Sequence, residues 1–539
     1  MNLILDSKPG LLPVIRANGE REYIAPWQLT TQHETNPIIK LNAPRPDFNG
    51  ALMQLLIGLI QTTFAPNEDR ARARKEPFKK PPSPEQLQQA FTPIAPAFEI
   101  DGENVRFLQD IDSLEKLEPK PITALLIDTA GSETHFVKHA QTGFCATCAV
   151  MALFTLQTNA PSGGVGHRTS LRGGGPLTTI LVYSPKGDIP ASLWRTIWLN
   201  ILTKEDKFYD SDKTAHEHIF SWLDATRTSN PKAKGCDTTL DDVHPLQMFW
   251  GMPRRIRLDT DNTTSGECAI CGTFSDKLIT HYRTKNYGVN YTGSWDHPLT
   301  PYSIDKKGQW LPVHPKSGGI TYRHWLGLVQ ENKALKSVPA KIIDNTERFK
   351  EFGNLKIWAF GYNMDNMKPI CWYESTMPLY YFPTEEEDRK AFMEDVENLI
   401  NAATEILGNL RSCLKNAWFS ENDPRKKGAN MAFIDNAFWQ NTESCFYTQL
   451  AKLQQWYEQT DAEPQPVSVL HPWHRYLHRY TLTEFDRWAN CSQIAQLNPK
   501  RIAAARSDLF KFNYKKSIKE MLRLPKKDTH PRGEYNIDC

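Results

Sequence analysis

The last third of the chain repeats apolar residues every three or four positions. That spacing is typical of an amphipathic helix, because residues three or four apart share one face. A second apolar stripe lies within 446–457, and further helical segments cover about 470–490 and 499–524, with proline-bearing turns between them. The pattern predicts a four-helix bundle over 384–539. The first stripe consists of Phe392, Val396, Leu399, Ala403, Ile406, Leu410 and Leu414.

The first two thirds of the chain has a more irregular pattern. Residues 51–64 form the longest apolar segment, which is too short and too polar to span a bilayer and predicts a buried helix. Between 122 and 383, short strand-like runs such as TTILVYS and LKIWAFGY are broken by glycine, proline and asparagine. We therefore predict the α+β class, with a large mixed α/β domain over 1–383 before the C-terminal four-helix bundle.

A basic, proline-bearing stretch, RARARKEPFKKPPSPEQ, occupies Arg70 to Gln86. Its composition is typical of an exposed loop. A solvated linker is the favoured interpretation, and a loop that contacts phosphate is the alternative.

The composition narrows the functional classes. In 539 residues, 64 Lys and Arg against 62 Asp and Glu leave a net charge of +2, so any polyanion must be held by local patches. The N-terminus, MNLILDSKPG, has no basic n-region and contains Asp6, which argues against a signal peptide and for a cytoplasmic protein that binds no membrane. In that setting the ten cysteines indicate reduced thiols or metal ligands rather than a disulfide framework.

Four of the cysteines form two C-x-x-C pairs. Cys145 and Cys148 (CATC) begin a helix-like run, and Cys268 and Cys271 (CAICG) lie in a knuckle that ends in glycine. Each short loop lets two thiolates converge on one ion, so we predict a tetrahedral zinc site. Two unrelated pairs remain an alternative, and a redox motif at Cys145 would leave the second pair unexplained. A closed site of four thiolates has no open coordination position and would be structural.

The segment Ser162–Gly175 (SGGVGHRTSLRGGG) contains six glycines and two arginines. It lacks the lysine of a P-loop, and it follows a helix-like run and precedes a strand-like run, the reverse of the Rossmann order. Small-nucleotide binding is therefore disfavoured. Glycines that permit close backbone approach, with Arg168 and Arg172 nearby, favour contact with nucleic acid, and a plain structural turn is the alternative.

These motifs, in their order along the chain, resemble the large-subunit family, CasA, of the type I-E CRISPR surveillance complex Cascade. The same order includes FAPNEDRARARKEPFKKPPSPEQLQQAF near the start, WDHPLTPY (Trp295–Tyr302) and GYNMDNMKPICWYES (Gly361–Ser375). The resemblance implies a mixed α/β N-terminal domain and a C-terminal four-helix bundle. It also implies a non-catalytic subunit that recognises the protospacer-adjacent motif in double-stranded DNA, starts unwinding and recruits a separate helicase-nuclease. The implied partners are crRNA-containing Cascade with its backbone and small subunits.

The resemblance also implies DNA-binding residues. The better-known members of the family have asparagine where Lys138 stands and glutamine where Asn366 stands, so motif preference and wedge geometry are expected to differ here. A lysine that enters the minor groove falls at Lys285, and the wedge that separates the first base pair falls on Asn363–Lys368. The implied positions are Phe136, Val137 and Lys138 before the first cysteine pair, Gly163, Gly164 and Gly166 in the glycine loop, Lys285, and Asn366.

Other candidate chemistry is weaker. His135 and His139, and likewise His474 and His478, have the i, i+4 spacing of metal ligands on a helix but lack the glutamate of H-E-x-x-H. We interpret them as packing or interaction residues. No nuclease-like carboxylate pair stands out, so we predict no enzyme. The alternative function is a zinc-stapled scaffold of a ribonucleoprotein without its own DNA readout.

Overall fold

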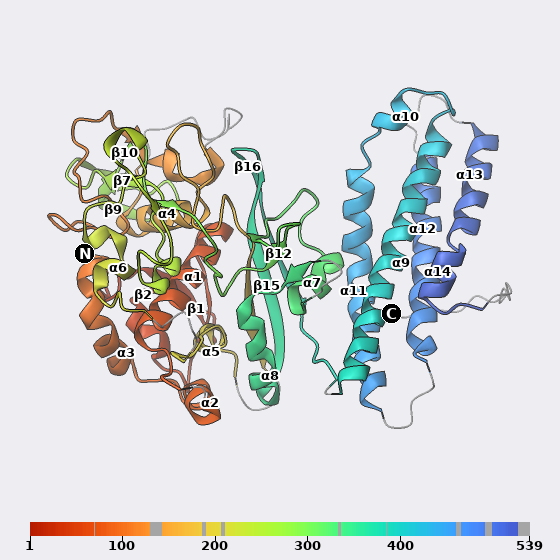
Figure 1. The fold of residues 1–539 in the computed structure, drawn as a ribbon, viewed down its shortest axis with the longest axis horizontal. Coiled ribbons are helices and arrows are strands. Elements are labelled where there is room, and N and C mark those ends of the chain that lie inside the picture. The colour runs from red at the N-terminus through yellow and green to blue at the C-terminus, as the bar shows by residue number, and fades with distance from the viewer. Residues whose placement is uncertain are drawn as a thin grey trace. The chain divides into compact units, whose positions relative to one another are not determined.

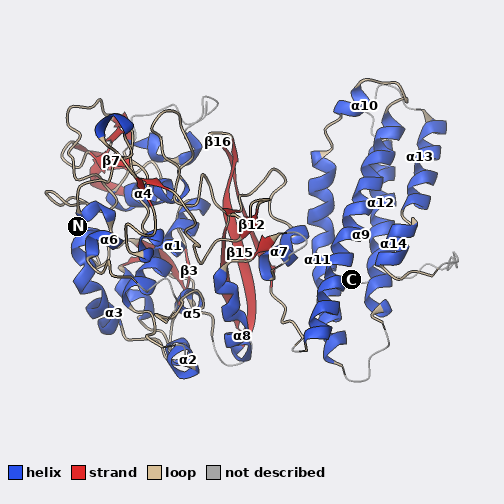
Figure 2. Ribbon diagram, in the orientation of Figure 1, coloured by secondary structure: helices blue, strands red, loops and turns tan. Residues whose placement is uncertain are grey.

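The structure is a computed structural model that describes residues 1–68, 70–129, 143–185, 190–205, 211–331, 336–383, 385–459, 465–490 and 498–525. The chain divides into two compact units (Figure 1). The first comprises Met1–Gly319 and Gly327–Leu379, and the second comprises Ile320–Leu326 and the chain from Tyr380 onward. Within the described ranges every strand belongs to the first unit, as Figure 2 shows.

Within its described residues, the first unit contains six small sheets. Their strand orders are β2-β1-β3, β4-β10-β7, β11-β6, β13-β12-β14, β16-β15-β5 and β8-β9. The strands are β1 (Leu12–Arg16), β2 (Arg21–Ile24), β3 (Ile38–Leu41), β4 (Lys120–Pro121), β5 (Thr178–Pro185), β6 (Asp237–Thr238), β7 (Arg255–Leu258), β8 (Thr263–Glu267), β9 (Phe274–Ile279), β10 (His281–Lys285), β11 (Asn290–Tyr291), β12 (Tyr302–Ile304), β13 (Trp310–Pro312), β14 (Ser337–Val338), β15 (Gly353–Asp365) and β16 (Lys368–Pro378).

The strands β15 and β16 form the longest hairpin of the described chain. β15 pairs antiparallel with β16 on one side and with β5 on the other, so β15 is central and β16 is an edge strand. Both sequence runs that read as strands, TTILVYS and LKIWAFGY, are confirmed, because they lie in β5 and β15. The hairpin turn falls at Asn366 and Met367, between the paired residues Asp365 and Lys368.

The helices of the first unit surround an apolar core. α1 is buried along nearly its whole length, which confirms the predicted buried helix at 51–64. It contacts α4 and α5, and Gly58 packs against Phe249 and Trp250, which supply aromatic walls. These helices are α1 (Pro46–Thr63), α2 (Ala71–Lys79), α3 (Pro84–Phe91), α4 (Ala146–Asn159), α5 (Leu193–Trp198), α6 (His216–Ile219), α7 (Trp325–Val329, which begins in the second unit) and α8 (Asn345–Phe349).

The basic stretch Arg70–Gln86 is not a linker, so that prediction is wrong. It contains all of α2 and the start of α3. Phe78 is fully buried and stacks on Phe352 with ring centroids 5.0 Å apart. Arg74 is also buried, and its guanidinium donates to Asn345 Oδ1 at 3.0 Å. Tertiary burial of these two side chains outweighs the loop-like composition.

The second unit contains the four helical segments that the apolar periodicity predicts. α9 contacts α11, α12, α13 and α14, and the long helices lie side by side in Figure 1. The last predicted segment is divided in two, because buried Asn513 ends α13 and hydrogen-bonds to Thr481 Oγ1 at 3.0 Å. The helices are α9 (Glu386–Trp418), α10 (Arg425–Gly428), α11 (Ala432–Glu458), α12 (Val467–Ala489), α13 (Pro499–Phe512) and α14 (Lys516–Met521).

Three further sequence expectations can be compared with the structure. His474 is buried and its Nε2 lies 2.8 Å from the Asn513 carbonyl oxygen, as expected for a packing histidine. Cys445 is disulfide-bonded, so the expectation of reduced thiols is wrong for this cysteine. Among the described helices, none combines the length and the apolar composition needed to cross a membrane.

Candidate metal centre and candidate DNA-binding residues

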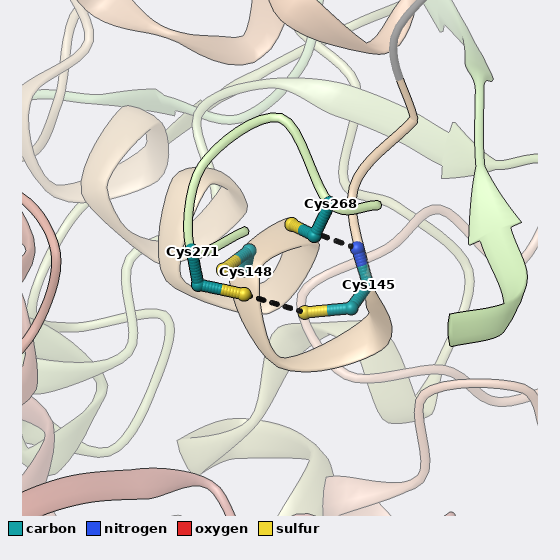
Figure 3. Close-up of side chains that lie close together, drawn as sticks. All are labelled: Cys145, Cys148, Cys268 and Cys271. Atoms are coloured by element: carbon teal, nitrogen blue, oxygen red, sulfur yellow. Dashed lines mark hydrogen bonds between the residues drawn. The ribbon is translucent and has the colours of Figure 1, made fainter. Parts of the chain in front are cut away.

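The four cysteines of the two C-x-x-C pairs converge. Their Sγ atoms all lie within 4.8 Å of one another, and Figure 3 shows the side chains pointing toward a common centre. Cys148 and Cys268 are buried, and Cys145 and Cys271 are half-buried. The predicted convergence of two distant pairs is therefore confirmed.

Local structure explains how each pair is positioned. Cys145 is the N-cap of α4, which places Cys148 in the first turn, on the same side of the helix. The second pair lies in a tight knuckle in which the Gly272 N–H donates to the Cys268 carbonyl oxygen at 2.9 Å. Gly272 has φ +72, a left-handed conformation that glycine adopts without steric cost. The final glycine of CAICG is thus needed for the turn.

Backbone hydrogen bonds join the two pairs. Phe144 and Ile279 exchange N–H···O bonds of 2.9 Å in both directions, and the Ala269 N–H donates to the Gly143 carbonyl oxygen at 3.1 Å. The backbone N–H of Cys145 also donates to Cys268 Sγ at 3.3 Å, as drawn in Figure 3. The chain before α4 is therefore held against the β8–β9 ribbon by main-chain contacts as well as by the thiols.

The donor set fits a tetrahedral metal ion. Metal–sulfur distances of about 2.3 Å imply Sγ–Sγ separations of about 3.8 Å. The Sγ atoms of Cys145 and Cys271 are 3.9 Å apart. Hydrogen bonds from the thiols of Cys145 and Cys148 hold the pKa of Cys268 far below its ordinary value, while hydrogen bonding to Cys145 raises the pKa of Cys148. The group is compatible with a structural metal ion whose positive charge would stabilise several thiolates together.

The glycine loop connects α4 to β5, as the order of the flanking sequence runs predicts. Gly164 and Gly166 have φ values of +94 and +75. A Cβ on Gly164 would meet no atom within 4 Å, whereas a Cβ on Gly166 would lie 2.9 Å from Asn286 Cβ. Neighbouring Val165 is 77% exposed. Gly164 therefore presents an unobstructed backbone, and Gly166 provides close packing.

Residues that follow β10 hold this loop in place. The Tyr287 N–H donates to the Gly166 carbonyl oxygen at 2.7 Å, and Asn286 Nδ2 donates to the Val165 carbonyl oxygen at 2.8 Å. At the loop's start, the half-buried Arg254 guanidinium donates to the Pro161 carbonyl oxygen, and desolvation lowers the pKa of Arg254 to about 10. The loop is thus fixed by residues about a hundred positions away in sequence.

Both loop arginines donate hydrogen bonds to acceptors within the protein. Arg172 is 4% exposed and donates to Gln54 Oε1, Thr178 Oγ1 and Thr300 Oγ1. Arg168 donates to the hydroxyl and the carbonyl oxygen of Ser229, at 2.7 and 3.1 Å. The expectation of phosphate contact is wrong for Arg172, because internal acceptors bury its guanidinium.

Lys285 ends β10, immediately before the residues that hold the glycine loop. Its side chain is 49% exposed, and its Nζ lies 3.6 Å from Asp112 Oδ2. Asp112 also accepts the Leu114 N–H at 3.2 Å and lies 3.5 Å from Arg255. The structure therefore brings Lys285 close to Gly166 in the fold, and it adds a carboxylate that sequence reasoning missed. No sequence signal distinguishes Asp112 from other surface acids.

Asn366 occupies the tip of the β15–β16 hairpin. Its φ is +55, and its Nδ2 donates to Asp365 Oδ1 at 3.2 Å. Next to it, Met367 is 49% exposed, an apolar tip residue that sequence reasoning did not single out. The hairpin also touches the glycine segment, since a Cβ on Gly175 would lie 2.6 Å from the Tyr362 carbonyl oxygen.

The structure describes five of the eight implied DNA-binding residues. Gly163, Gly164 and Gly166 share one loop, and Lys285 lies beside it through Asn286 and Tyr287. Asn366 lies at the tip of the β15–β16 hairpin, and strand β15 packs against the end of the same glycine segment. The remaining three positions, Phe136, Val137 and Lys138, lie outside the described residues, as do His135 and His139.

The sequence matches one family model, that of CRISPR-associated protein Cse1, over residues 11–483. The match extends over well more than half of the chain. One solved relative from Thermus thermophilus is described as CasA (Cse1), so the two names denote one family. The resemblance noted from the motifs is thereby confirmed.

Solved structures of similar fold cover almost the whole chain. A CasA from Thermus thermophilus has a TM-score of 0.71 and 15% identity, with 95% of this chain and 99% of that chain covered. Thermobifida fusca Cse1 has a TM-score of 0.69 and 15% identity, with coverages of 97% and 98%. A chain of a CRISPR RNA-guided surveillance complex gives 0.64 and 13%, with coverages of 96% and 99%. At these identities the likeness concerns the fold.

Proposed function

We propose, because the chain belongs to the CRISPR-associated protein Cse1 family, that it is the non-catalytic large subunit of an RNA-guided DNA surveillance complex of the type I-E Cascade kind. In this role it recognises the protospacer-adjacent motif in double-stranded target DNA and starts unwinding. It then recruits a separate helicase-nuclease. Its partners are crRNA and the backbone and small subunits, and it acts in the cytoplasm. A structurally similar chain belongs to a CRISPR RNA-guided surveillance complex, which supports the proposed assembly.

The observation that carries this proposal is the packing of the glycine segment between two other candidate elements. One end is bonded to Tyr287 beside Lys285, and the other end packs on Tyr362 of the hairpin strand. Exposed backbone, a lysine and a hairpin tip are groups that can probe the minor groove and its width. Minor-groove readout is degenerate, which suits loose recognition of a short motif while guide pairing reads the target sequence.

We assign the metal as zinc and its role as structural. Four thiolates at tetrahedral spacing are the donor set that zinc prefers in closed sites. When bound, zinc would hold the start of α4 against the knuckle between β8 and β9. The glycine loop follows α4 directly, so this anchoring supports the position of the candidate DNA-binding loop.

The loop arginines donate hydrogen bonds within the protein, which favours the alternative function of a zinc-stapled scaffold without DNA readout. Arg172 is buried, Arg168 is bonded to Ser229, and Lys285 lies near Asp112, so the loop region offers fewer cations than its sequence suggests. Phosphate contacts normally supply most of the affinity for DNA. DNA recognition at this loop would therefore depend on backbone approach more than on charge.

Substituting Gly164→Asp tests the proposal against the scaffold alternative. The aspartate adds bulk and negative charge at an open loop position, so motif-dependent duplex binding should be lost while the complex with crRNA still assembles. Gly19→Asp is the matched control, because Gly19 also has positive φ and an open Cβ position. Affinities for motif and non-motif duplexes are measured with the assembled complex over a salt series. Undiminished discrimination by Gly164→Asp would contradict the proposal and favour the scaffold function.

A further inference from the structure

A groove of about 590 Å³ lies beside the glycine segment in the first unit. Its wall on one side is β13, an edge strand of the β13-β12-β14 sheet. Leu171, Arg172 and Gly173 of the glycine segment form part of another wall. All of its lining residues are among those that the structure describes. None of the DNA-binding positions implied by the family resemblance lines this groove.

Trp310 is the prominent aromatic group of the groove. Its side chain is 41% exposed, although tryptophan buries much of its surface in most proteins. The ring packs on one side against Tyr302, with centroids 5.7 Å apart, which fixes its orientation. Adjacent Leu311 is 47% exposed. A held and accessible indole ring is a suitable platform for stacking a planar group.

The groove is lined by basic groups and by no carboxylate. Lys316 lines the groove and is exposed. Arg172 lines the interior, and the acceptors of its buried guanidinium, Gln54, Thr178 and Thr300, are all neutral. Because these acceptors already engage the guanidinium, Arg172 adds positive charge behind the groove wall and makes no direct contact with a ligand. The groove therefore combines an aromatic platform with positive charge.

The charged side chains that line a neighbouring cavity are mainly acidic, in contrast to those of the basic groove. That cavity, of about 670 Å³, shares Trp310 as a wall and is lined by Asp296, Glu331 and Asp344 with one lysine, Lys341. A phosphate group would be repelled on the acidic side of Trp310 and attracted on the Lys316 side. An anionic ligand with a planar ring would thus enter only the basic groove.

We propose that this groove binds one unpaired nucleotide of the target DNA, with its base stacked on Trp310 and its phosphate close to Lys316. The inference rests on the proposed function for the identity of the ligand. Aromatic stacking within a basic groove is the usual way that proteins hold single strands. The groove accepts any base, because every base offers a ring face for stacking.

Continuity with the hairpin favours target DNA as the occupant. Ser317, next to Lys316, accepts a 3.3 Å hydrogen bond from Asn363 Nδ2 of β15. Within the lining, a Cβ on Gly173 would lie 2.9 Å from the His314 ring, so the glycine segment packs directly against the residues that follow β13. The hairpin strand β15 is thus joined to the residue next to Lys316 by the Asn363–Ser317 hydrogen bond and to the glycine segment by the Tyr362–Gly175 contact.

The test uses the full-length chain and a ten-nucleotide single-stranded DNA with a central 5-bromodeoxyuridine. Removing one stacked base should weaken binding about tenfold, so Trp310→Ala is expected to lose that affinity and Trp310→Phe to keep most of it. Lys316→Glu should weaken binding most at low salt. Phe274→Ala and Lys232→Glu change exposed side chains outside the groove and should bind as the unmodified chain does. Photo-crosslinking should map to Trp310.

Unchanged affinity in both Trp310→Ala and Lys316→Glu, with crosslinks elsewhere, overturns the inference. An RNA of the same sequence that binds more tightly with the same Trp310 dependence overturns the assignment to DNA. Acrylamide quenching of Trp310 that disappears when sister subunits assemble would show a protein occupant and also overturns it. Motif discrimination on duplex DNA is measured separately. If it is absent while Trp310-dependent single-strand binding persists, the proposed function fails and with it the assignment to target DNA, whereas single-strand binding by the groove stands.

Discussion

The backbone N–H of Tyr287 donates to the carbonyl oxygen of Gly166 at 2.7 Å, and a second bond from Asn286 to Val165 lies beside it. The residues of this second bond are 121 positions apart in sequence. The glycine loop is therefore part of a defined tertiary contact and has a fixed position relative to β10. Substitutions in either segment are expected to affect the other.

Gly166→Ala should destabilise the protein more than Gly164→Ala. Both positions have positive φ, which costs a non-glycine residue about 1 to 2 kcal/mol. Only Gly166 would also place its Cβ within 2.9 Å of Asn286 Cβ. Chemical denaturation of the two variants measures the difference. Equal midpoints would show that the loop moves freely away from residues 286 and 287.

Loss of the cysteine cluster should remove one metal ion. We expect about one equivalent of zinc in the unmodified protein and far less in a Cys145→Ala/Cys268→Ala double variant, with local unfolding of both loops. Elemental analysis and limited proteolysis check this. Cys371→Ser is the control, since Cys371 is free, exposed and outside the cluster. Full zinc retention in the double variant would contradict the assignment.

The contributions of the Asn366 side chain and of its backbone conformation can be tested separately. Asn366→Gly keeps the positive φ of the hairpin turn and removes the amide, whereas Asn366→Ala also strains the turn. If the amide starts base-pair opening, both variants should slow the first opening step while a target with a mismatched bubble beside the motif restores the rate. Full activity of Asn366→Gly would assign the role to turn geometry alone.

Lys285→Ala should lower the slope of log affinity against log salt by about one if the lysine contacts phosphate. A groove contact would instead change motif discrimination. Asp112→Asn removes the competing carboxylate and should raise affinity for all duplexes. Unchanged binding in both variants would exclude Lys285 from the interface.

The pKa of Asp112 lies below its ordinary value, because its carboxylate accepts the Leu114 N–H and lies near Lys285 and Arg255. Folding therefore favours the ionised form. This contribution to stability is present above the ordinary carboxyl pKa of about 4 and is lost as the pH falls through the lower folded value. At neutral pH the carboxylate stays charged, so the effect of Asp112→Asn on duplex affinity should not vary between pH 6 and 8.

Arg523→Ala should destabilise the second unit by about 3 to 5 kcal/mol, because it leaves a buried carboxylate without its cation. Asp395 is fully buried and lies 2.6 Å from Arg523 Nη2. Burial raises the pKa of Asp395, so its ionisation opposes folding as the pH rises through that value. The deficit of the variant should therefore shrink at acidic pH. Asp395→Asn combined with Arg523→Ala should recover part of the loss in denaturation experiments.

The features that the sequence predicts best depend on local spacing. The helices after residue 384 follow from a 3.6-residue apolar period, and the cysteine cluster follows from two C-x-x-C loops whose geometry is short-range. The division of the last helix could not be predicted, because buried Asn513 bonds to Thr481 on another helix. Asparagine is only mildly unfavourable within a helix, so its local signal is weak.

The sequence predictions that are wrong for arginines concern residues whose hydrogen-bond partners lie far away in the sequence. Arg172 reads as a phosphate-contacting residue beside glycines, but its acceptors include Gln54 and Thr300, which are 118 and 128 positions away. Arg74 likewise bonds to Asn345 across 271 positions. Composition shows that an arginine is present without showing whether folding supplies acceptors that bury it.

The four-cysteine centre can form only after the second cysteine pair has been synthesised. Cys268, whose Sγ accepts the Cys145 N–H, follows that residue by 123 positions. At 5 to 20 residues per second, a ribosome adds this length in about 6 to 25 s. During that interval Cys145 and Cys148 have been made without their partners, and their thiols are open to oxidation or to binding a metal in a two-cysteine complex. The supply of reductant and zinc to nascent chains would therefore influence how much correctly folded protein a cell obtains.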